Sequence, residues 1–277
     1  MSEGKKEILL GDCLELMKDI PNGSIDLILT DPPYNTTDCK WDKQPIDWNV
    51  LKNEFMRIIK PTGTICISVQ NPFGFLVGGL FAEIYRHRWV WEKDKCGNFL
   101  AAKGQPLKYT EDILVFSKKY SPNVSNGWTD CHIYNPQMRE GTGKARKTNS
   151  ERFGLSSREI KSEKNPLPLI SNPETDGIVR YPADIIYFSV PHRKDERFHP
   201  TQKPIELFEY LIKTYTNENM LVLDCFSGSG TTAIAAMKTR RQFICIEKEQ
   251  KYYDIILKRV GDFNKNFEPQ TLFGNEM

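Results

Sequence analysis

The sequence predicts an α/β fold with a parallel sheet and helices on both of its faces. Short apolar runs typical of buried strands alternate with amphipathic helical segments over residues 8–120, and the alternation resumes over residues 198–262. Strands that alternate with helices form parallel sheets covered on both sides. With 277 residues, 39% of them hydrophobic, the chain is long enough to bury the core of one large domain or of two small ones.

In the first part of the chain, the patterns predict strands at residues 8–10, 25–30, 64–69, 89–91 and 111–116, and helices at 13–17, 48–60 and 73–87. The helix at 48–60 is justified by Leu51, Phe55 and Ile58, which share one face at helical spacing, and by the Pro and Gly that follow it. The strand at 25–30 is a largely apolar run that stops at two prolines, as a buried strand does.

In the last part, the patterns predict helices at 205–215, 231–238 and 250–260 and strands at 220–225 and 242–246. Pro204 is expected at the first position of the first helix, where its missing N–H costs nothing. From Gly261 on, the tail is expected to be poorly ordered.

The middle of the chain, from Ser121 to about Arg197, has little periodicity. Residues 138–164 contain eight Lys or Arg and four Glu, a local charge of +4 in a chain whose net charge is +2. A solvated loop is the plain interpretation of such a stretch. Loops of this length are uncommon in compact domains unless they have a function, so the concentrated positive charge favours a binding segment.

Composition excludes several classes of protein. The charged fraction of 27% is ordinary, which argues against global disorder. The sequence has no apolar run long enough for a transmembrane helix, and its start lacks the apolar stretch of a signal peptide. Seven cysteines with no Cys-x-x-Cys pair suit a reducing cytoplasm, and the four histidines match no standard zinc spacing. We therefore expect a cytoplasmic protein without a metal site.

A glycine loop with an acid after the next strand predicts a nucleotide-like ligand. Phe226-Ser227-Gly228-Ser229-Gly230 follows a strand, and Glu247 ends the next strand, 19 positions after Gly228. Glycines allow a sharp turn and a close approach of the ligand, and the acid can accept hydrogen bonds from ribose hydroxyls. The loop itself does not separate a dinucleotide from an adenosine ligand, or from a tight turn without a ligand.

Asp31-Pro32-Pro33-Tyr34 is the second candidate site, at the carboxyl end of the strand at 25–30. Two prolines stiffen the backbone, so a carboxylate, a fixed carbonyl and an aromatic ring lie within four residues. The exocyclic amine of adenine or cytosine is a poor nucleophile because its lone pair is delocalised into the ring. Asp31 and the Pro32 carbonyl can each accept one N–H, and Tyr34 can stack on the base. A plain turn that ends a strand is the alternative.

These motifs together resemble the DNA amino-methyltransferases that use S-adenosylmethionine. Asp31-Pro32-Pro33-Tyr34 looks like their catalytic motif, and the stretch from Asp224 to Thr231 looks like their cofactor motif, with Cys225 in place of the usual Pro. His199-Pro200-Thr201-Gln202-Lys203-Pro204 matches a third motif almost letter for letter. Trp91-Glu92-Lys93 and the strand from Glu111 also resemble sequences of this family.

The order of the motifs resembles the permuted beta class, which implies a permuted Rossmann-like methyltransferase sheet with an inserted target recognition region. On this interpretation, residues 1–120 form the catalytic half, 121–197 the inserted region, 198–262 the cofactor-binding half and 263–277 a tail. Within the inserted region, Lys144, Arg146 and Lys147 are expected to contact DNA phosphates. The loop from Asn35 to Gln44, which contains Trp41, is expected to close over a flipped base.

The resemblance implies catalytic roles for Asp31, Pro32, Pro33 and Tyr34. It implies a cofactor site formed by Asp12, Cys13, Asp31, Thr201, Lys203, Asp224, Phe226, Gly228, Ser229, Gly230, Thr231 and Glu247. Asp12 would accept from the cofactor adenine, or cap the helix that follows it, or both. Lys203 would pair with the methionine carboxylate, although the residues themselves show only an exposed base ahead of a helix.

The implied reaction is direct methyl transfer to N6 of a flipped adenine in double-stranded DNA, with no covalent enzyme intermediate. Transfer to cytosine N4 is the nearest alternative, and Asp31 favours adenine because family members acting on cytosine more often carry Ser there. A NAD-dependent dehydrogenase or a non-enzymatic DNA-binding protein would leave the Asp-Pro-Pro-Tyr stretch unexplained. A homodimer and a cognate restriction enzyme stay open as partners, and no membrane partner is expected.

Overall fold

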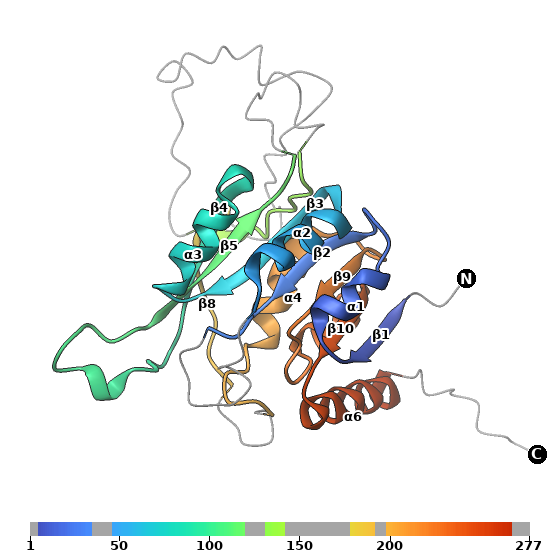
Figure 1. Cartoon of the computed structure of the whole chain (residues 1–277). Coiled ribbons are helices and arrows are strands. Elements are labelled where there is room, and N and C mark those ends of the chain that lie inside the picture. Colours follow the sequence, from blue (N-terminus) through green and yellow to red (C-terminus); the bar gives the residue numbers. More distant parts are fainter. Residues whose placement is uncertain (1–4, 35–45, 120–130, 142–177, 192–197, 268–277) are drawn as a thin grey trace, which may run out of the picture.

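The structure, a computed structural model, describes residues 5–34, 46–119, 131–141, 178–191 and 198–267. An eight-stranded sheet in the order β1-β10-β9-β2-β3-β5-β4-β8 runs through it (Figure 1). The strands are β1 (Lys6–Leu10), β2 (Ile25–Thr30), β3 (Ile59–Val69), β4 (Tyr85–Glu92), β5 (Thr110–Phe116), β8 (Ile185–Tyr187), β9 (Leu221–Asp224) and β10 (Gln242–Glu247).

Helices cover both faces of this sheet, as the sequence predicts. The helices are α1 (Cys13–Leu16), α2 (Trp48–Ile58), α3 (Phe73–Leu80), α4 (Ile205–Tyr215), α5 (Thr231–Lys238) and α6 (Gln250–Phe267), with short 3₁₀ helices η1 (Met17–Asp19), η2 (Ala82–Ile84) and η3 (Phe99–Ala101). Apolar side chains of α1, α2 and α3 pack on one face in one core cluster. Those of α4, α5 and α6 pack on the other face in a second cluster. Burial of these two apolar layers is the main driving force for the fold.

The sheet is mixed: the predicted parallel arrangement is present in most of it, and one strand runs antiparallel to its neighbours. β1, β10, β9, β2 and β3 are parallel neighbours. β5 runs antiparallel to both β3 and β4, and β8 is parallel to β4. The chain passes from β4 to β5 without a crossover helix, and only a crossover of that kind makes consecutive neighbours parallel.

Several element boundaries differ from the sequence-based prediction. The helix expected at 73–87 ends at Leu80, and Tyr85–Glu92 is a strand whose buried Trp89 and Trp91 alternate with more exposed residues. Pro204 occupies the N-cap of α4 with an extended backbone rather than the first helical turn. The last helix continues through Gly261 to Phe267, because its amphipathic pattern outweighs the helix penalty of one glycine.

Part of the predicted inserted region belongs to the main body. β8 pairs with β4 in the large sheet, and β6 (Arg139–Gly141) pairs with β7 (Ile178–Arg180) in a small second sheet. The Tyr134 ring lies 6.2 Å from that of Tyr215 on α4, and Asn135 donates to the Thr216 carbonyl at 3.1 Å. These short segments lack the periodicity that would reveal them, because their neighbours in space supply their stability.

The pairing of β2 with β9 sets the position of the site. Leu27 is in register with Val222, and Ile28 with Leu223, although the paired residues come from opposite ends of the chain. The carboxyl ends of β1, β2, β9 and β10 therefore meet at one edge of the sheet, where α/β proteins place their ligands.

Candidate active site

A cavity of about 710 Å³ opens at this edge of the sheet. Among the predicted site residues that the structure describes, all but Gly230 line it: Asp12, Cys13, Asp31, Pro32, Pro33, Tyr34, Thr201, Lys203, Asp224, Phe226, Gly228, Ser229, Thr231 and Glu247. The predicted DNA contacts Lys144, Arg146 and Lys147, and Trp41 with its loop, lie outside the described residues. The tertiary structure thus gathers three motifs that are far apart in the chain.

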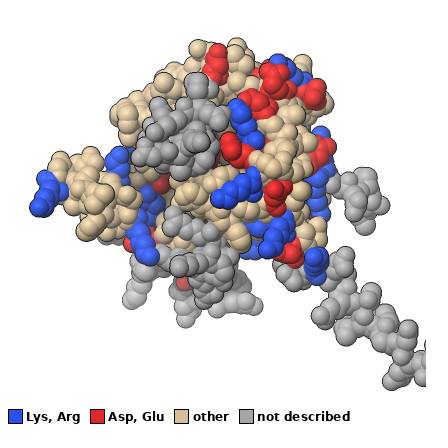
Figure 2. Space-filling model, turned by 60° about the horizontal axis from the view of Figure 1, so that its bottom comes forward, with Lys and Arg blue, Asp and Glu red and all other residues tan. Residues whose placement is uncertain are grey.

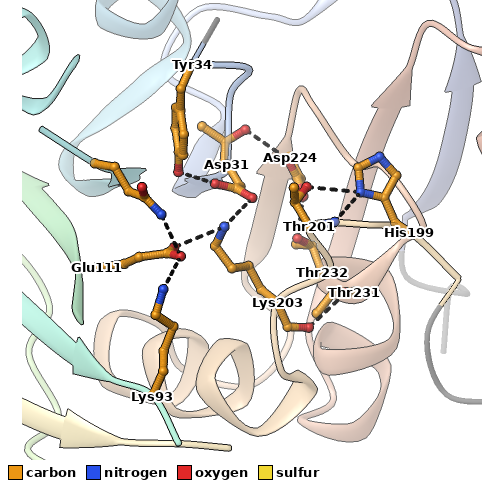
Figure 3. A network of polar contacts seen from close by, with 12 residues as sticks. Asp31, Tyr34, Lys93, Glu111, His199, Thr201, Lys203, Asp224, Thr231 and Thr232 are labelled. Atoms are coloured by element: carbon orange, nitrogen blue, oxygen red, sulfur yellow. Dashed lines mark hydrogen bonds and ion pairs between the residues drawn. The ribbon is translucent and has the colours of Figure 1, made fainter. Parts of the chain in front are cut away.

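Asp31 is held at the cavity wall through both carboxylate oxygens. Lys203 Nζ donates to Oδ2 at 2.6 Å, and the Tyr34 hydroxyl donates to Oδ1 (Figure 3). The Asp31 side chain is 19% exposed, and the Lys203 side chain is 6% exposed. A carboxylate has about four acceptor positions, so two contacts fix its orientation and leave capacity for a ligand N–H.

Lys203 is buried, which corrects the picture of an exposed base that the residues alone present. Its ammonium lies 3.2 Å from Glu111 Oε2, while Glu111 Oε1 accepts from Lys93 Nζ at 2.9 Å and from Gln70 Nε2 at 2.9 Å. Figure 3 shows this network running from Tyr34 through Asp31, Lys203 and Glu111 to Lys93. The two lysines balance the two carboxylates, so the cluster is formally neutral.

The electrostatics of this cluster follow from burial and pairing. Burial raises the pKa of Asp31, partly opposed by the Lys203 charge. Burial also acts to raise the pKa of Glu111, but the charges of Lys203 and Lys93 outweigh it and hold that pKa below its ordinary value. The pKa of Lys203 is raised, because Asp31 and Glu111 outweigh the opposing effect of burial. Lys203 is therefore a permanent cation beside Asp31 at neutral pH.

The Tyr34 ring forms part of an aromatic wall. Its centroid lies 5.0 Å from that of Phe73, with the ring planes tilted by 37°, and Lys203 Nζ lies 5.8 Å from the Tyr34 centroid. Phe73 in turn packs against Trp48 at 5.1 Å. A planar ring supported in this way has little rotational freedom, which suits it to stack on a base.

Glu247 and the glycine loop form the opposite part of the cavity. The backbone N–H of Gly228 donates to Glu247 Oε2 at 2.7 Å, and that of Glu249 donates to Oε1 at 2.8 Å. Burial raises the pKa of Glu247 to about 7, although these two N–H groups act against the rise. Gly228 has a φ of +53°, a left-handed conformation that glycine adopts without strain.

Asp224 and Gly230 shape the loop from within the protein. Asp224 Oδ1 accepts from Thr30 Oγ1 at 2.8 Å and from the Phe226 N–H at 3.1 Å, while Oδ2 accepts from the Thr232 hydroxyl. Burial raises its pKa to about 6. At Gly230, where φ is +79°, a Cβ atom would lie 2.8 Å from Ile256 on α6. Gly230 thus permits close helix packing and does not line the cavity.

Asp12 caps α1, as one of its two expected roles requires. Its Oδ1 accepts from the Leu14 N–H at 2.9 Å, and Lys248 Nζ donates to Oδ2 at 3.1 Å. Burial opposes ionisation, but Lys248 and the Leu14 N–H outweigh it and lower the pKa of Asp12. The Gly11 N–H donates to the Glu247 carbonyl at 2.9 Å, which holds Asp12 beside the end of β10.

Four site residues had no assigned role in the sequence: Gln70, Lys93, Glu111 and His199. Lys93 and Glu111 lie in two stretches for which the sequence shows only a general resemblance to the family. Gln70 directly follows β3. His199 packs edge-on against Tyr252 at 4.3 Å, and its Nδ1 lies 3.1 Å from Thr201 Oγ1. For Lys93 and Glu111, the available signal was a charged residue at a strand end near the motifs.

Two further features concern the described part of the chain. None of its helices combines the length and apolar character needed to span a membrane. None of its His, Cys, Asp and Glu residues gather in threes in a way that would hold a metal ion.

The profile of the N6/N4 methyltransferase family, described as DNA methylase, matches residues 25–258. DNA adenine methyltransferase YhdJ of Escherichia coli (strain K12) is 32% identical over 269 residues, which cover 92% of this chain and 82% of YhdJ. Type II methyltransferase M.BglII of Bacillus subtilis is 29% identical over 283 residues, which cover 94% of this chain and 71% of that protein.

Two solved structures share the fold. The M1.HpyAVI–SAM complex aligns with a TM-score of 0.59 at 23% identity, covering 92% of this chain and 99% of its own. PvuII DNA methyltransferase, described as cytosine-N4-specific, aligns with a TM-score of 0.63 at 17% identity, covering 97% of this chain and 88% of its own. Because the family profile spans most of the sequence, the chain belongs to the N6/N4 family of DNA methylases, which use S-adenosylmethionine.

Proposed function

We propose that this chain is a site-specific methyltransferase that modifies N6 of an adenine flipped out of duplex DNA. The observation that carries the proposal is the Asp31 carboxylate, fixed by Lys203 and Tyr34 at the wall of the cavity. A dehydrogenase or a non-enzymatic DNA-binding protein has no use for this arrangement, and membership of the methylase family argues against both.

The chemistry required of the protein is orientation and charge stabilisation. Asp31 and the Pro32 carbonyl accept the two N–H bonds of the amine, which favours a tetrahedral nitrogen with its lone pair directed outward. Tyr34 stacks on the base and holds it in the cavity. S-adenosylmethionine, when bound, supplies the electrophilic methyl group. Asp31 then stabilises the positive charge that develops on the nitrogen, an effect strengthened by its low exposure.

The residues at the glycine loop fit an adenosyl group. Glu247 faces the cavity with its carboxylate held by two backbone N–H groups, which leaves acceptor positions for the two ribose hydroxyls. Asp12 is within the same wall and can accept from the adenine amine. Lys203 lines the cavity as a cation that donates to Asp31 and lies 3.2 Å from Glu111, so it can also pair with the methionine carboxylate.

Adenine is favoured over cytosine by two observations. Asp31, rather than Ser, precedes the two prolines, and the 32% identical relative YhdJ is described as a DNA adenine methyltransferase. Cytosine N4 is the second candidate because the fold is shared with a cytosine-N4-specific enzyme. The basic segment with Lys144, Arg146 and Lys147 is proposed to contact the phosphates of the duplex. Relatives described as type II methyltransferases support a restriction enzyme as a genetic partner.

The test is to incubate the protein with duplex DNA and S-adenosylmethionine labelled in its methyl group, and then to identify the labelled nucleoside by mass spectrometry. N6-methyldeoxyadenosine is the expected product. Label in N4-methyldeoxycytidine would support the second candidate, and label in neither nucleoside would reject both. Sequencing of the methylated positions then gives the recognition site.

A further inference from the structure

The connection between β4 and β5, residues 93–109, forms an arm that projects from the body (Figure 1, lower left). Its two sides are joined at the root, where the Lys93 N–H donates to the Tyr109 carbonyl at 2.7 Å. Farther out, Asn98 donates to the Pro106 carbonyl at 3.1 Å and accepts from the Lys108 N–H at 2.6 Å. The arm therefore has a defined shape that its own hydrogen bonds maintain.

The tip of the arm presents two large apolar side chains to water. Phe99 is 73% exposed and Leu100 is 98% exposed, on the short helix η3. Exposing apolar surface is unfavourable, and such a pair at the end of a projecting element is typical of a contact surface.

The arm is also basic. It contains four lysines and one aspartate, and only Lys93 lies in the buried cluster with Glu111. Lys95, Lys103 and Lys108 are exposed, and no carboxylate in the described part of the chain pairs with them. Figure 2 shows basic side chains on this projection, at the left of the view. A surface of lysines around an apolar tip suits a polyanion that also offers aromatic faces.

The base of the arm borders the active-site cavity. Lys95, Asn98 and Lys108 line the same cavity as Asp31 and Tyr34. A nucleotide held in the cavity would therefore lie close to the base of the arm.

We propose that the arm is a DNA-contacting element whose lysines bind phosphates and whose Phe99 and Leu100 insert beside the target base pair. Apolar wedges of this kind unstack base steps, and their insertion offsets the stacking that disappears when a base leaves the helix. This inference rests on the proposed function, because it takes duplex DNA as the substrate. It assigns to residues 93–109 a role separate from that of the basic segment at 138–164.

The first test replaces the tip by Phe99→Ala/Leu100→Ala. The matched control is Phe75→Ala/Leu76→Ala on α3, whose side chains are 73% and 54% exposed but do not line the cavity. On a fully paired duplex, the tip variant should show a roughly tenfold lower kcat/KM, in line with the removal of one stacking interaction. On a duplex whose target base faces an abasic site, it should recover wild-type kcat/KM, because that base is already unpaired. The control variant should match the wild type on both duplexes.

The second test replaces Lys95, Lys103 and Lys108 by Ala and measures DNA affinity across a salt series. The slope of log affinity against log salt should fall by about 0.9 for every phosphate that the variant no longer binds. The control is Arg240→Ala, an exposed residue ahead of β10 at the edge of the sheet opposite the cavity. Cofactor affinity, measured by calorimetry, should stay at the wild-type value in the tip variant and in both control variants, because none of their replaced residues lines the cavity.

If kcat/KM of the tip variant decreased equally on the paired and abasic duplexes, the proposed wedge role would be overturned. A wild-type kcat/KM of this variant on both duplexes would also overturn it. A change in oligomeric state by light scattering in the tip variant would show that the tip contacts a second copy of the chain instead. These outcomes are independent of which base is methylated, because each variant is compared with the wild type on the same duplex. Absence of any methyl transfer would reject the proposed function, while the salt series would still report on the arm.

Discussion

The Lys203 ammonium lies 2.6 Å from the Asp31 carboxylate, although 172 positions separate the two residues in the chain. Asp31 follows β2 in the half that carries the catalytic motif, and Lys203 precedes α4 in the half that carries the glycine loop. One buried ion pair thus joins Asp31, the proposed acceptor for the target amine, to the half of the chain that carries the proposed cofactor residues. Substitution of either Asp31 or Lys203 should therefore affect both halves of the chain.

Asp31→Ala should lower kcat by at least about 100-fold, the range seen when one preorganised charge-stabilising group is removed. Binding of S-adenosylmethionine should stay measurable, because Lys203 keeps Glu111 as an ion-pair partner. Single-turnover methyl transfer and calorimetry measure the two quantities separately. A variant with near-normal turnover would show that Asp31 does not act on the amine.

Tyr34→Phe should reduce kcat by roughly tenfold. From the sequence, this variant is expected to be mild because the ring remains, but the structure shows the hydroxyl donating to Asp31. A hydrogen bond to a charged group is worth about 1.5–3 kcal/mol. Tyr34→Ala should lose a further 1–3 kcal/mol or so through base stacking. Tyr85→Phe, away from the cavity, is the control, and a Tyr34→Phe rate equal to the wild-type rate would remove the hydroxyl from the mechanism.

Glu111→Gln should destabilise the fold by about 3 kcal/mol at pH 7, because it leaves Lys93 and Lys203 buried with too little negative charge. The folded-state pKa of Glu111 is depressed, so its stabilising effect is present above its ordinary pKa. That effect is lost as the pH falls through the folded-state value. Denaturant unfolding should show that the free energies of unfolding of the wild type and the variant become equal in acid.

The control for this measurement is Glu83→Gln, which breaks the more exposed Lys52–Glu83 pair and should change stability little. Equal stability of Glu111→Gln and the wild type at pH 7 would mean that water reaches the cluster.

Affinity for S-adenosylmethionine should fall as the pH drops below about 7. Burial raises the pKa of Glu247 to about 7 in the free protein, and hydroxyl donors from the ribose would favour the ionised form. Binding therefore becomes weaker by up to about tenfold per pH unit below that value, and it is independent of pH above it. Calorimetry from pH 5.5 to 8.5 measures the profile.

Glu247→Gln is the control for this pH profile. It should bind the cofactor about 1–3 kcal/mol more weakly at pH 8 and should lose the pH dependence. The same pH profile in the variant would assign the titration to another group.

Replacing Lys144, Arg146 and Lys147 together by Ala should flatten the salt dependence of DNA binding. These residues lie outside the described part of the structure, so this prediction rests on charge alone. Removing each phosphate contact should reduce the slope by about 0.9. Sequence preference should survive, since phosphate contacts carry little sequence information. An unchanged slope would identify the stretch as a solvated loop.

The local motifs could be predicted from residues that lie close together in the sequence. The helix at 231–238 and the strand at 25–30 match the prediction residue for residue, and the helix at 205–215 differs only in that Pro204 is its N-cap. Apolar periodicity and flanking Gly or Pro are encoded within each segment. The Asp-Pro-Pro-Tyr turn and the glycine loop were recognisable for the same reason. Proline restricts the backbone and glycine widens its allowed conformations, and both effects are properties of the residues themselves.

Only the tertiary structure decided what these motifs contact. Lys203 looked like an exposed base, yet it is the buried partner of Asp31 and Glu111, because the pairing of β2 with β9 brings the two halves together. The close approach of Gly230 to Ile256 on α6, where an added Cβ atom would lie at 2.8 Å, likewise depends on a distant segment. Burial and pairing of charges depend on neighbours that are far away in the chain, and a periodic pattern in one segment carries no record of which segment will pack against it.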